Sequence, residues 1–319
     1  MSKPLLIVLA AGVASALASL SMATGSVLAL LMMYVAPLPL LLAGLALGPR
    51  LAALAAAAGF AVTGLLGGTA AAAVFGLLHA APAWVVVRQA LAYRTAPDGT
   101  IEWSSPGGIV AWLALMAAAM VAGAATALSG GDGLEAAVQA SLDQAFRQLS
   151  LPDPLREGWL DILVPLFPGF AGSAWVVTTV ANAALAQALL ARSGRALRPS
   201  PAFADLTLPD WASVGLVAVA GLAVAATAIE AGELRYLGRN LAVVLMVPFF
   251  FQGLAVVHAM ARRSMNGTML LAAFYLLVLV FDGAKLLVAG VGVFEQWVGI
   301  RRRFAGPVPA RKPDDGEEE

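Results

Sequence analysis

Apolar residues in this chain come in long unbroken runs, separated by short breaks of glycine, proline and charged residues. A helix that crosses a bilayer needs about 20 apolar residues, each adding about 1.5 Å. The runs are apolar on every face and rich in Ala, Leu and Gly, whereas a membrane β-strand alternates apolar and polar positions. The pattern therefore predicts an all-α, polytopic integral membrane helix bundle with about eight to ten transmembrane segments.

Ten apolar segments lie between the breaks: 5–24, 27–47, 51–66, 69–93, 109–128, 162–191, 211–229, 240–261, 268–281 and 285–300. The third is short, so its junction with the fourth at Gly67-Gly68-Thr69 is either a turn or a kink. One helix over 268–303 would measure about 54 Å, far more than a bilayer. We therefore expect a break at Asp282-Gly283 and a tight hairpin.

Lysine and arginine mark the loops that stay in the cytoplasm. With ten crossings, every predicted inside loop is cationic: Lys3; Arg50; Arg88 and Arg94; Arg192, Arg195 and Arg198; Arg262 and Arg263; Arg301, Arg302 and Arg303. The longest outside loop, 129–161, is acidic. We expect a multi-pass protein of the bacterial inner (plasma) membrane with both termini cytoplasmic. Residues 1–303 would form the membrane domain, and 304–319 a disordered acidic tail.

The first segment has features of a signal peptide, because Lys3 precedes an apolar stretch and Ala14–Ala16 resembles a cleavage site. We favour an uncleaved first helix, since a second apolar run begins at once.

The acidic outer loop contains an amphipathic segment at about 132–150. One helical face carries Leu134, Val138, Leu142, Phe146 and Leu149, spaced by four, four, four and three residues. Asp132 is placed to cap this helix, and Asp143 and Arg147 to pair on its polar side. The helix is interpreted as lying on the outer membrane surface, either as a passive cover or as a gating lid.

Three stretches resemble the YybS-like family of bacterial membrane proteins, which share domain of unknown function 2232. They run from Pro37-Leu38-Pro39-Leu40 to Arg50, from Asn240-Leu241 to His258, and from Gly290 to Arg303. The resemblance implies a distant similarity to the substrate-binding S-components of energy-coupling-factor vitamin transporters and to the rod-shape protein MreD. It implies no ligand and no functional residue. S-components usually have six helices, fewer than the segments counted here.

Composition excludes several kinds of chemistry. The formal net charge is zero, so there is no basic footprint for nucleic acid. The chain has no cysteine and two histidines, which makes a metal site improbable. None of its three lysines follows a glycine, so a phosphate-binding loop is excluded. We expect no cofactor and no enzymatic activity.

Polar residues inside apolar segments are the remaining candidates for a site, because burying them in a membrane is costly. Asn182 and Gln252 lie near the middle of their segments and either join helices or line a solute pocket. Pro165, Pro168 and Gly169 interrupt the sixth segment, as a plain kink or as an unwound wall of a cavity.

Asp282 and Lys285, three residues apart, either pair within the membrane or lie at the hairpin turn. Glu295 precedes Arg301 by six residues and is expected at the membrane interface. Two functions remain open. One is a small-solute-binding protein that works with an energising subunit, as S-components do. The other is a non-transporting membrane scaffold of an envelope complex, as MreD-like proteins are.

Overall fold

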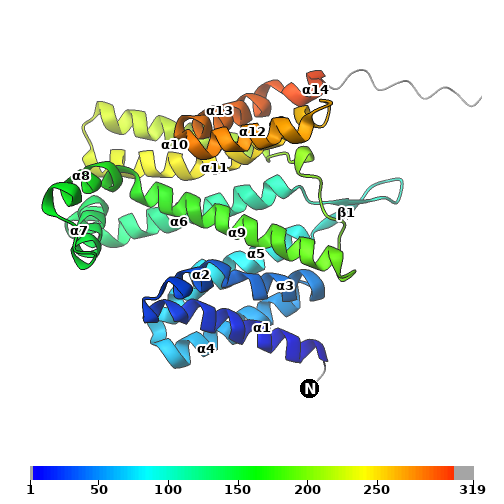
Figure 1. The fold of residues 1–319 in the computed structure, drawn as a ribbon, viewed down its shortest axis with the longest axis horizontal. Coiled ribbons are helices and arrows are strands. Elements are labelled where there is room, and N and C mark those ends of the chain that lie inside the picture. The colour runs from blue at the N-terminus through cyan, green and yellow to red at the C-terminus, as the bar shows by residue number, and fades with distance from the viewer. Residues whose placement is uncertain (1–2, 305–319) are drawn as a thin grey trace, which may run out of the picture.

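The computed structural model describes residues 3–304. Its helices are α1 (Lys3–Leu20), α2 (Val27–Val35), α3 (Pro37–Leu47), α4 (Pro49–Phe75), α5 (Ala81–Ala90), α6 (Pro106–Leu128), α7 (Gly133–Gln148), α8 (Asp153–Leu163), α9 (Phe167–Arg192), α10 (Asp210–Ala228), α11 (Gly232–Ala261), α12 (Gly267–Val280), α13 (Asp282–Val298) and α14 (Ile300–Phe304) (Figure 1). The fold confirms an all-α polytopic bundle. Apart from Phe304, the predicted tail 304–319 lies outside the described residues.

Within residues 3–304, seven helical stretches are long and apolar enough to cross a membrane, and an eighth arises if α12 and α13 form one bent span. Three of the seven join more than one helix: Val27–Leu47 joins α2 and α3, and two others are much longer. Pro49–Ala90 has 42 residues, and Asp153–Arg192 has 40. The α12–α13 pair bends by 119° at Phe281, next to the break that the sequence predicts at Asp282-Gly283.

Gly68 divides the 42-residue stretch Pro49–Ala90 into two helices that run back along each other. Its backbone is not helical (φ 82°, ψ 178°), a conformation that favours glycine. A Cβ on Gly59 would lie 2.6 Å from the ring of Phe75. In a straight helix those residues would be about 24 Å apart. The junction of the third and fourth predicted segments is therefore a turn, and all ten segments are present as helices.

The loops gather at two ends of the bundle. The start of α1, the hairpin of β1 (Tyr93–Thr95) with β2 (Ile101–Trp103), and α14 lie toward one end, and α7 and α8 toward the other (Figure 1). We call these the arginine-rich end and the acidic end. The hairpin corrects the predicted end of the fourth segment, because α5 stops at Ala90 and Tyr93 pairs with Trp103.

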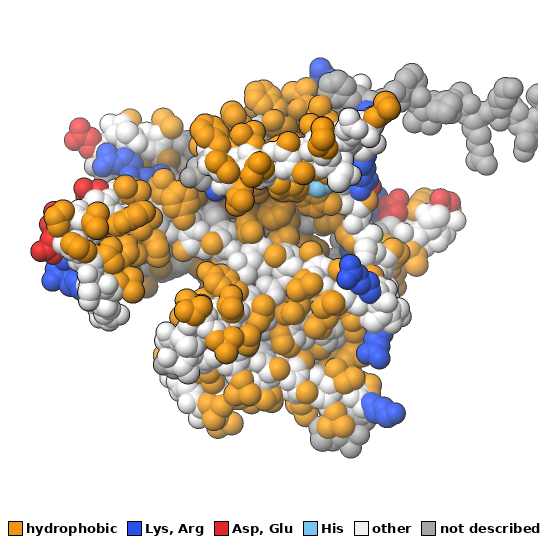
Figure 2. Space-filling view, viewed as in Figure 1, with side chains coloured by type: hydrophobic (Ala, Val, Ile, Leu, Met, Phe, Trp, Pro, Cys, Tyr) orange, Lys and Arg blue, Asp and Glu red, His pale blue; other side chains and the backbone are white. Residues whose placement is uncertain are grey.

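Large apolar side chains cover the surface between the two ends, and most charged side chains sit near the ends (Figure 2). Leu65 is 85% exposed, Leu279 78% and Val27 77%, each on a different helix. An exposed apolar surface this extensive is unfavourable in water but matches a hydrocarbon solvent.

Helix α11 is packed by α6, α9, α10 and α13. Its contact with α13 depends on small residues. A Cβ on Gly253 would lie 1.9 Å from the carbonyl oxygen of Val288, and one on Gly292 would lie 1.8 Å from that of Phe249. Such a close approach of two backbones is a common way for membrane helices to pack.

At the acidic end, α7 forms the amphipathic helix that the sequence predicts, but its N-terminal cap differs from the predicted one. In α7, Leu134 and Leu142 are buried, and Arg147 Nε pairs with Asp143 Oδ2 at 2.8 Å. Asp132 makes no capping bond. The N–H of Leu134 instead donates to Glu233 Oε2 on α11, at 3.4 Å. Helix α8, which the sequence analysis left within a loop, follows directly.

Candidate functional site

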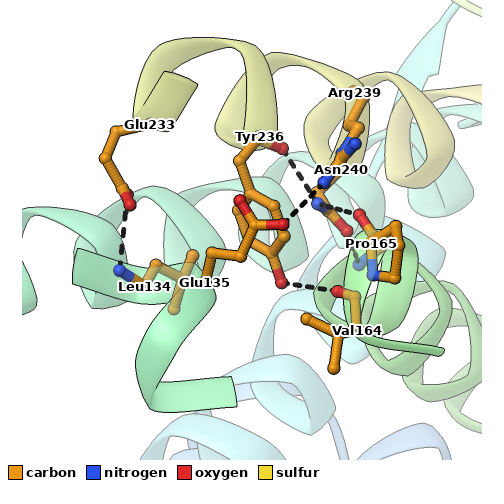
Figure 3. Close-up of polar contacts among 9 residues, drawn as sticks. Leu134, Glu135, Val164, Pro165, Glu233, Tyr236, Arg239 and Asn240 are labelled. Atoms are coloured by element: carbon orange, nitrogen blue, oxygen red, sulfur yellow. Dashed lines mark hydrogen bonds and ion pairs between the residues drawn. The ribbon is translucent and has the colours of Figure 1, made fainter. Parts of the chain in front are cut away.

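Side chains of α11 form hydrogen bonds to the backbone at the break between α8 and α9. Proline has no N–H, so Pro165 and Pro168 interrupt the helical ladder and leave a short 3-10 turn, Val164–Leu166. Asn240 Oδ1 accepts the N–H of Gly169 at 2.8 Å, and its Nδ2 donates to the carbonyl of Pro165 at 3.1 Å (Figure 3). Asn240 is fully buried. The predicted wall of a cavity therefore faces α11 rather than open space.

Other residues of α11 complete the acidic end. The hydroxyl of Tyr236 donates to the carbonyl of Val164 at 2.8 Å, and Tyr236 is 1% exposed. Arg239 lies over the Tyr236 ring and pairs with Glu135 of α7 at 3.2 Å (Figure 3). We call Glu135, Glu233, Tyr236, Arg239 and Asn240 the acidic-end cluster. Its bonds tie α7, α8 and α9 to α11, and Arg239 Nε is buried in it without a hydrogen-bond partner among the described residues.

Asn182 has a similar role at another break. It is buried on α9 and its Nδ2 donates to the carbonyl of Tyr34, at 2.8 Å, where Pro37 separates α2 from α3. Ser15 of α1 donates to the carbonyl of Ala36 at 2.6 Å in the same break. Asn182 thus joins α9 to the end of α2 by bonding a backbone carbonyl at the break between α2 and α3.

The same device recurs at η2, a π-helical turn over Gly76–Ala80. Pro82 cannot donate to the carbonyl of Leu78, and the indole Nε1 of Trp175 donates to it at 3.0 Å. An unsatisfied backbone group in a membrane costs several kcal/mol, on the order given for polar groups in hydrocarbon. Four side chains therefore mainly bond backbone groups at breaks between helices: Asn182, Asn240, Ser15 and Trp175.

Gln252 on α11 is different, because it faces a cavity. It is 3% exposed, and its Nε2 donates to Gln296 Oε1 of α13 at 3.0 Å. Gln296 Nε2 in turn donates to Asp210 Oδ1 at 3.4 Å. Gln252 Oε1 is buried and has no hydrogen-bond partner among the described residues. Such an orphan is rare, since a buried acceptor without a donor costs about 1–3 kcal/mol.

The cavity beside Gln252 measures about 590 Å³ and lies at the arginine-rich end between α10, α11, α13 and the 204–208 segment. We call it the polar cavity. Its charged lining residues balance, three acidic and three basic: Asp205, Asp210, Glu295, Arg263, Arg301 and Arg302. Gln252 lies nine residues before the end of α11, so the cavity reaches about 13 Å along that helix.

Glu295 and Arg301 form the fixed part of this lining. Arg301 Nε pairs with Glu295 Oε1 at 2.8 Å, and Arg301 also donates to the carbonyls of Ala204 and Leu206. Glu295 is 6% exposed, so its side chain is buried within the protein, and its expected position at the membrane interface stays a prediction. The chain turns at Gly299, in the left-handed region, and this turn brings two residues six apart into contact.

The structure does not bring the seven predicted site residues together. Asn182 contacts α2, Gln252 contacts α13, and the Pro165–Gly169 turn contacts Asn240. Asp282 begins α13 at the hairpin bend, and Lys285 is exposed on the same helix. Of the seven, only Gln252 lines the polar cavity. Asn240 and Gln296 were missed, although the amide of Asn240 stands at the start of a predicted segment.

The fold defines the class: a polytopic α-helical membrane protein. The model of the family described as "Predicted membrane protein (DUF2232)" matches residues 12–295, which is most of the chain. The chain therefore belongs to this family, which is the YybS-like family that the sequence resembles. No protein of curated function and no solved structure matches it.

Proposed function

We propose that this membrane protein binds a small polar solute in the polar cavity. The observation that carries the proposal is Gln252, which lines a cavity of about 590 Å³ and whose Oε1 is a buried acceptor without a donor among the described residues. Cavities of a few hundred to about 1,000 Å³ with a few convergent polar groups are typical of small-molecule sites. A solute N–H or O–H that reaches Gln252 would satisfy the amide.

The charges around the cavity favour a zwitterionic solute, such as an amino acid. Asp205 and Asp210 offer carboxylates to a cationic group, and Arg302 offers a guanidinium to an anionic group. Glu295 and Arg301 neutralise each other and hold the lining in place. A solute with both charges matches this lining better than a solute with either charge alone.

In this proposal the polar cavity and both termini lie on the cytoplasmic side of a bacterial inner membrane, because loops rich in arginine favour that side. Movement of the solute across the bilayer would need energy. Because the sequence has no phosphate-binding loop, an energising membrane subunit is the partner in this proposal, as for S-components. We assign no catalytic role to the chain.

The test is a stability screen of the purified full chain in detergent against zwitterionic amino acids, each probed singly. A ligand raises the melting temperature of the state that binds it. We expect at least one amino acid to do so, and the Gln252→Leu variant to lose that shift. Asn182→Leu is the matched control, because it removes a buried amide that borders no part of the polar cavity.

A shift that persists in Gln252→Leu, or that Asn182→Leu abolishes to the same extent, would overturn the assignment of the cavity. A complete absence of shifts would overturn the solute-binding proposal. The second candidate is a scaffold, favoured by the bonds of the acidic-end cluster, which join α7, α8 and α9 to α11. Its signature is a stable membrane partner in a pull-down together with no amino-acid response.

A further inference from the structure

A second cavity, independent of the proposed function, lies on the flank of α9. It measures about 280 Å³ and is lined almost wholly by apolar side chains from α3, α5, α6, α9 and α11 and from the 198–206 segment. We call it the apolar groove. Its α9 wall runs from Val180 to Ala188, and both Ala184 and Ala188 are exposed. The groove therefore opens onto the lipid-facing surface of the bundle.

Arg198 lines the groove at its end nearest the arginine-rich loops. The residue is 7% exposed. Its Nη1 donates to the carbonyls of Ala90, at 2.7 Å, and Ser104, at 3.3 Å, and its Nε donates to that of Pro199 at 3.4 Å. The guanidinium also lies 5.5 Å from the centre of the Trp103 ring. Each of these partners is electrically neutral.

A buried cation normally has an anionic partner, because carbonyl dipoles only partly replace the water that the charge has lost. Among the side chains that the structure describes, no carboxylate lies within ion-pair distance of Arg198, and its Nη2 makes no hydrogen bond. Burial lowers the pKa of Arg198, but an arginine stays charged at neutral pH. The site therefore lacks one negative charge.

The position and shape of the apolar groove indicate what kind of molecule would supply the missing negative charge. Val180 and Ala188 are eight residues apart, so the α9 wall extends about 12 Å. One leaflet of the hydrocarbon core is about 15 Å deep. A chain that lies in the groove would thus run through most of a leaflet, with its headgroup beside Arg198. Nη2 of Arg198 is the guanidinium nitrogen without a hydrogen bond to the described residues, so it would donate to a phosphate oxygen in a charge-assisted bond.

We propose that the apolar groove binds an anionic phospholipid, with an acyl chain along α9 and the headgroup phosphate on Arg198. The groove sits at the arginine-rich end, so the lipid would belong to the leaflet on that side. The proposal requires both parts of the site. A neutral lipid would fill the groove without pairing Arg198, and a free phosphate would pair Arg198 without filling the groove.

The experiment measures lipid retention by native mass spectrometry of the full chain, supplied with phosphatidylglycerol or phosphatidylcholine of the same acyl chains. Phosphatidylglycerol should be retained preferentially. Ala184→Phe, which fills the groove, should lose this retention. Ala181→Phe is the matched control, because Ala181 is exposed on the same helix but does not line the groove.

The charge is tested with Arg198→Gln, which should weaken phosphatidylglycerol retention by about tenfold, the loss of one charge-assisted contact. Arg195→Gln, an exposed arginine in the same loop, should have no effect. Equal retention of the two lipids would overturn the proposal, as would equal behaviour of Ala184→Phe and Ala181→Phe. Competition by glycerol phosphate alone would show a phosphate site rather than a lipid site.

Discussion

The acidic-end cluster and the polar cavity each contain a buried amide of α11, and the two amides are twelve residues and about 18 Å apart. Asn240, at the acidic end, uses both its oxygen and its nitrogen on the broken backbone of Pro165 and Gly169. Gln252, at the arginine-rich end, uses only its nitrogen. The same functional group is therefore fully satisfied at one end and half satisfied at the other.

The difference follows from what each amide faces. Asn240 meets a proline break, which offers a carbonyl and an N–H at fixed positions. Gln252 meets the side chain of Gln296 on α13, and a cavity lies beside it. An amide with both atoms bonded holds its neighbours in place, whereas an acceptor without a donor leaves room for a partner from outside the chain. We infer that the Asn240 amide supports the fold at the acidic end, and in the proposed function the Gln252 amide contacts the solute.

The largest expected contrast between the ends is in accessibility. The chain has no cysteine, so single cysteines can report the side of the membrane on which each residue lies. Glu157→Cys on α8 and Arg303→Cys on α14 are both at exposed positions. In intact spheroplasts an impermeant maleimide should label Glu157→Cys, and should label Arg303→Cys only after the membrane is opened. The opposite result would reverse the predicted topology.

The next largest contrast is expected in how much the ion pair at each end contributes to the free energy of unfolding. Glu295 and Arg301 are 5% and 15% exposed, so Arg301→Met would leave a buried carboxylate unpaired. The expected loss is about 3–5 kcal/mol of unfolding free energy, measured by unfolding in mixed detergent micelles. Arg239 and Glu135 are 35% and 42% exposed, so Arg239→Met should cost about 1 kcal/mol or less. Equal losses would mean that the two pairs do not differ in burial.

The Asn240→Leu variant should have the next largest effect, roughly 2–3 kcal/mol. It leaves the N–H of Gly169 and the carbonyl of Pro165 without the partners that Asn240 provides. The same unfolding measurement checks the loss. Asn266→Leu, at an exposed position, is the control and should change stability by less than about 0.5 kcal/mol. An unchanged Asn240→Leu protein would mean that water or a lipid replaces the amide.

Features that depend on neighbouring residues were predictable from the sequence. The turn at Gly68 and the bend before Gly283 follow from local glycine and charge, and α7 follows from the spacing of its apolar face. Helix α8 was not predicted, because it is short and exposes an apolar stripe in which Leu155 is 59% exposed and Ile162 is 66% exposed. Periodicity alone does not separate such a helix from the start of the next span.

The partners of the polar residues were not predictable, because they come from distant parts of the chain. Asn182 bonds a residue 148 positions away, and Asn240 one 75 positions away. The sequence shows that an amide lies in an apolar segment, but not whether it meets a broken backbone or a cavity. Glu295 shows the same limit, since its burial depends on the turn at Gly299.

The smallest expected effect on stability is the most informative about function. Gln252→Leu removes one hydrogen bond to Gln296 but also removes the orphan Oε1, so the gain and the loss nearly cancel. Unfolding free energy should change by less than about 1 kcal/mol, whereas Asn240→Leu loses more. A loss from Gln252→Leu as large as that from Asn240→Leu would mean that the amide is already satisfied. In that case the amide of Gln252 would be as fully bonded as that of Asn240, and the polar cavity would have no unpaired acceptor for a solute.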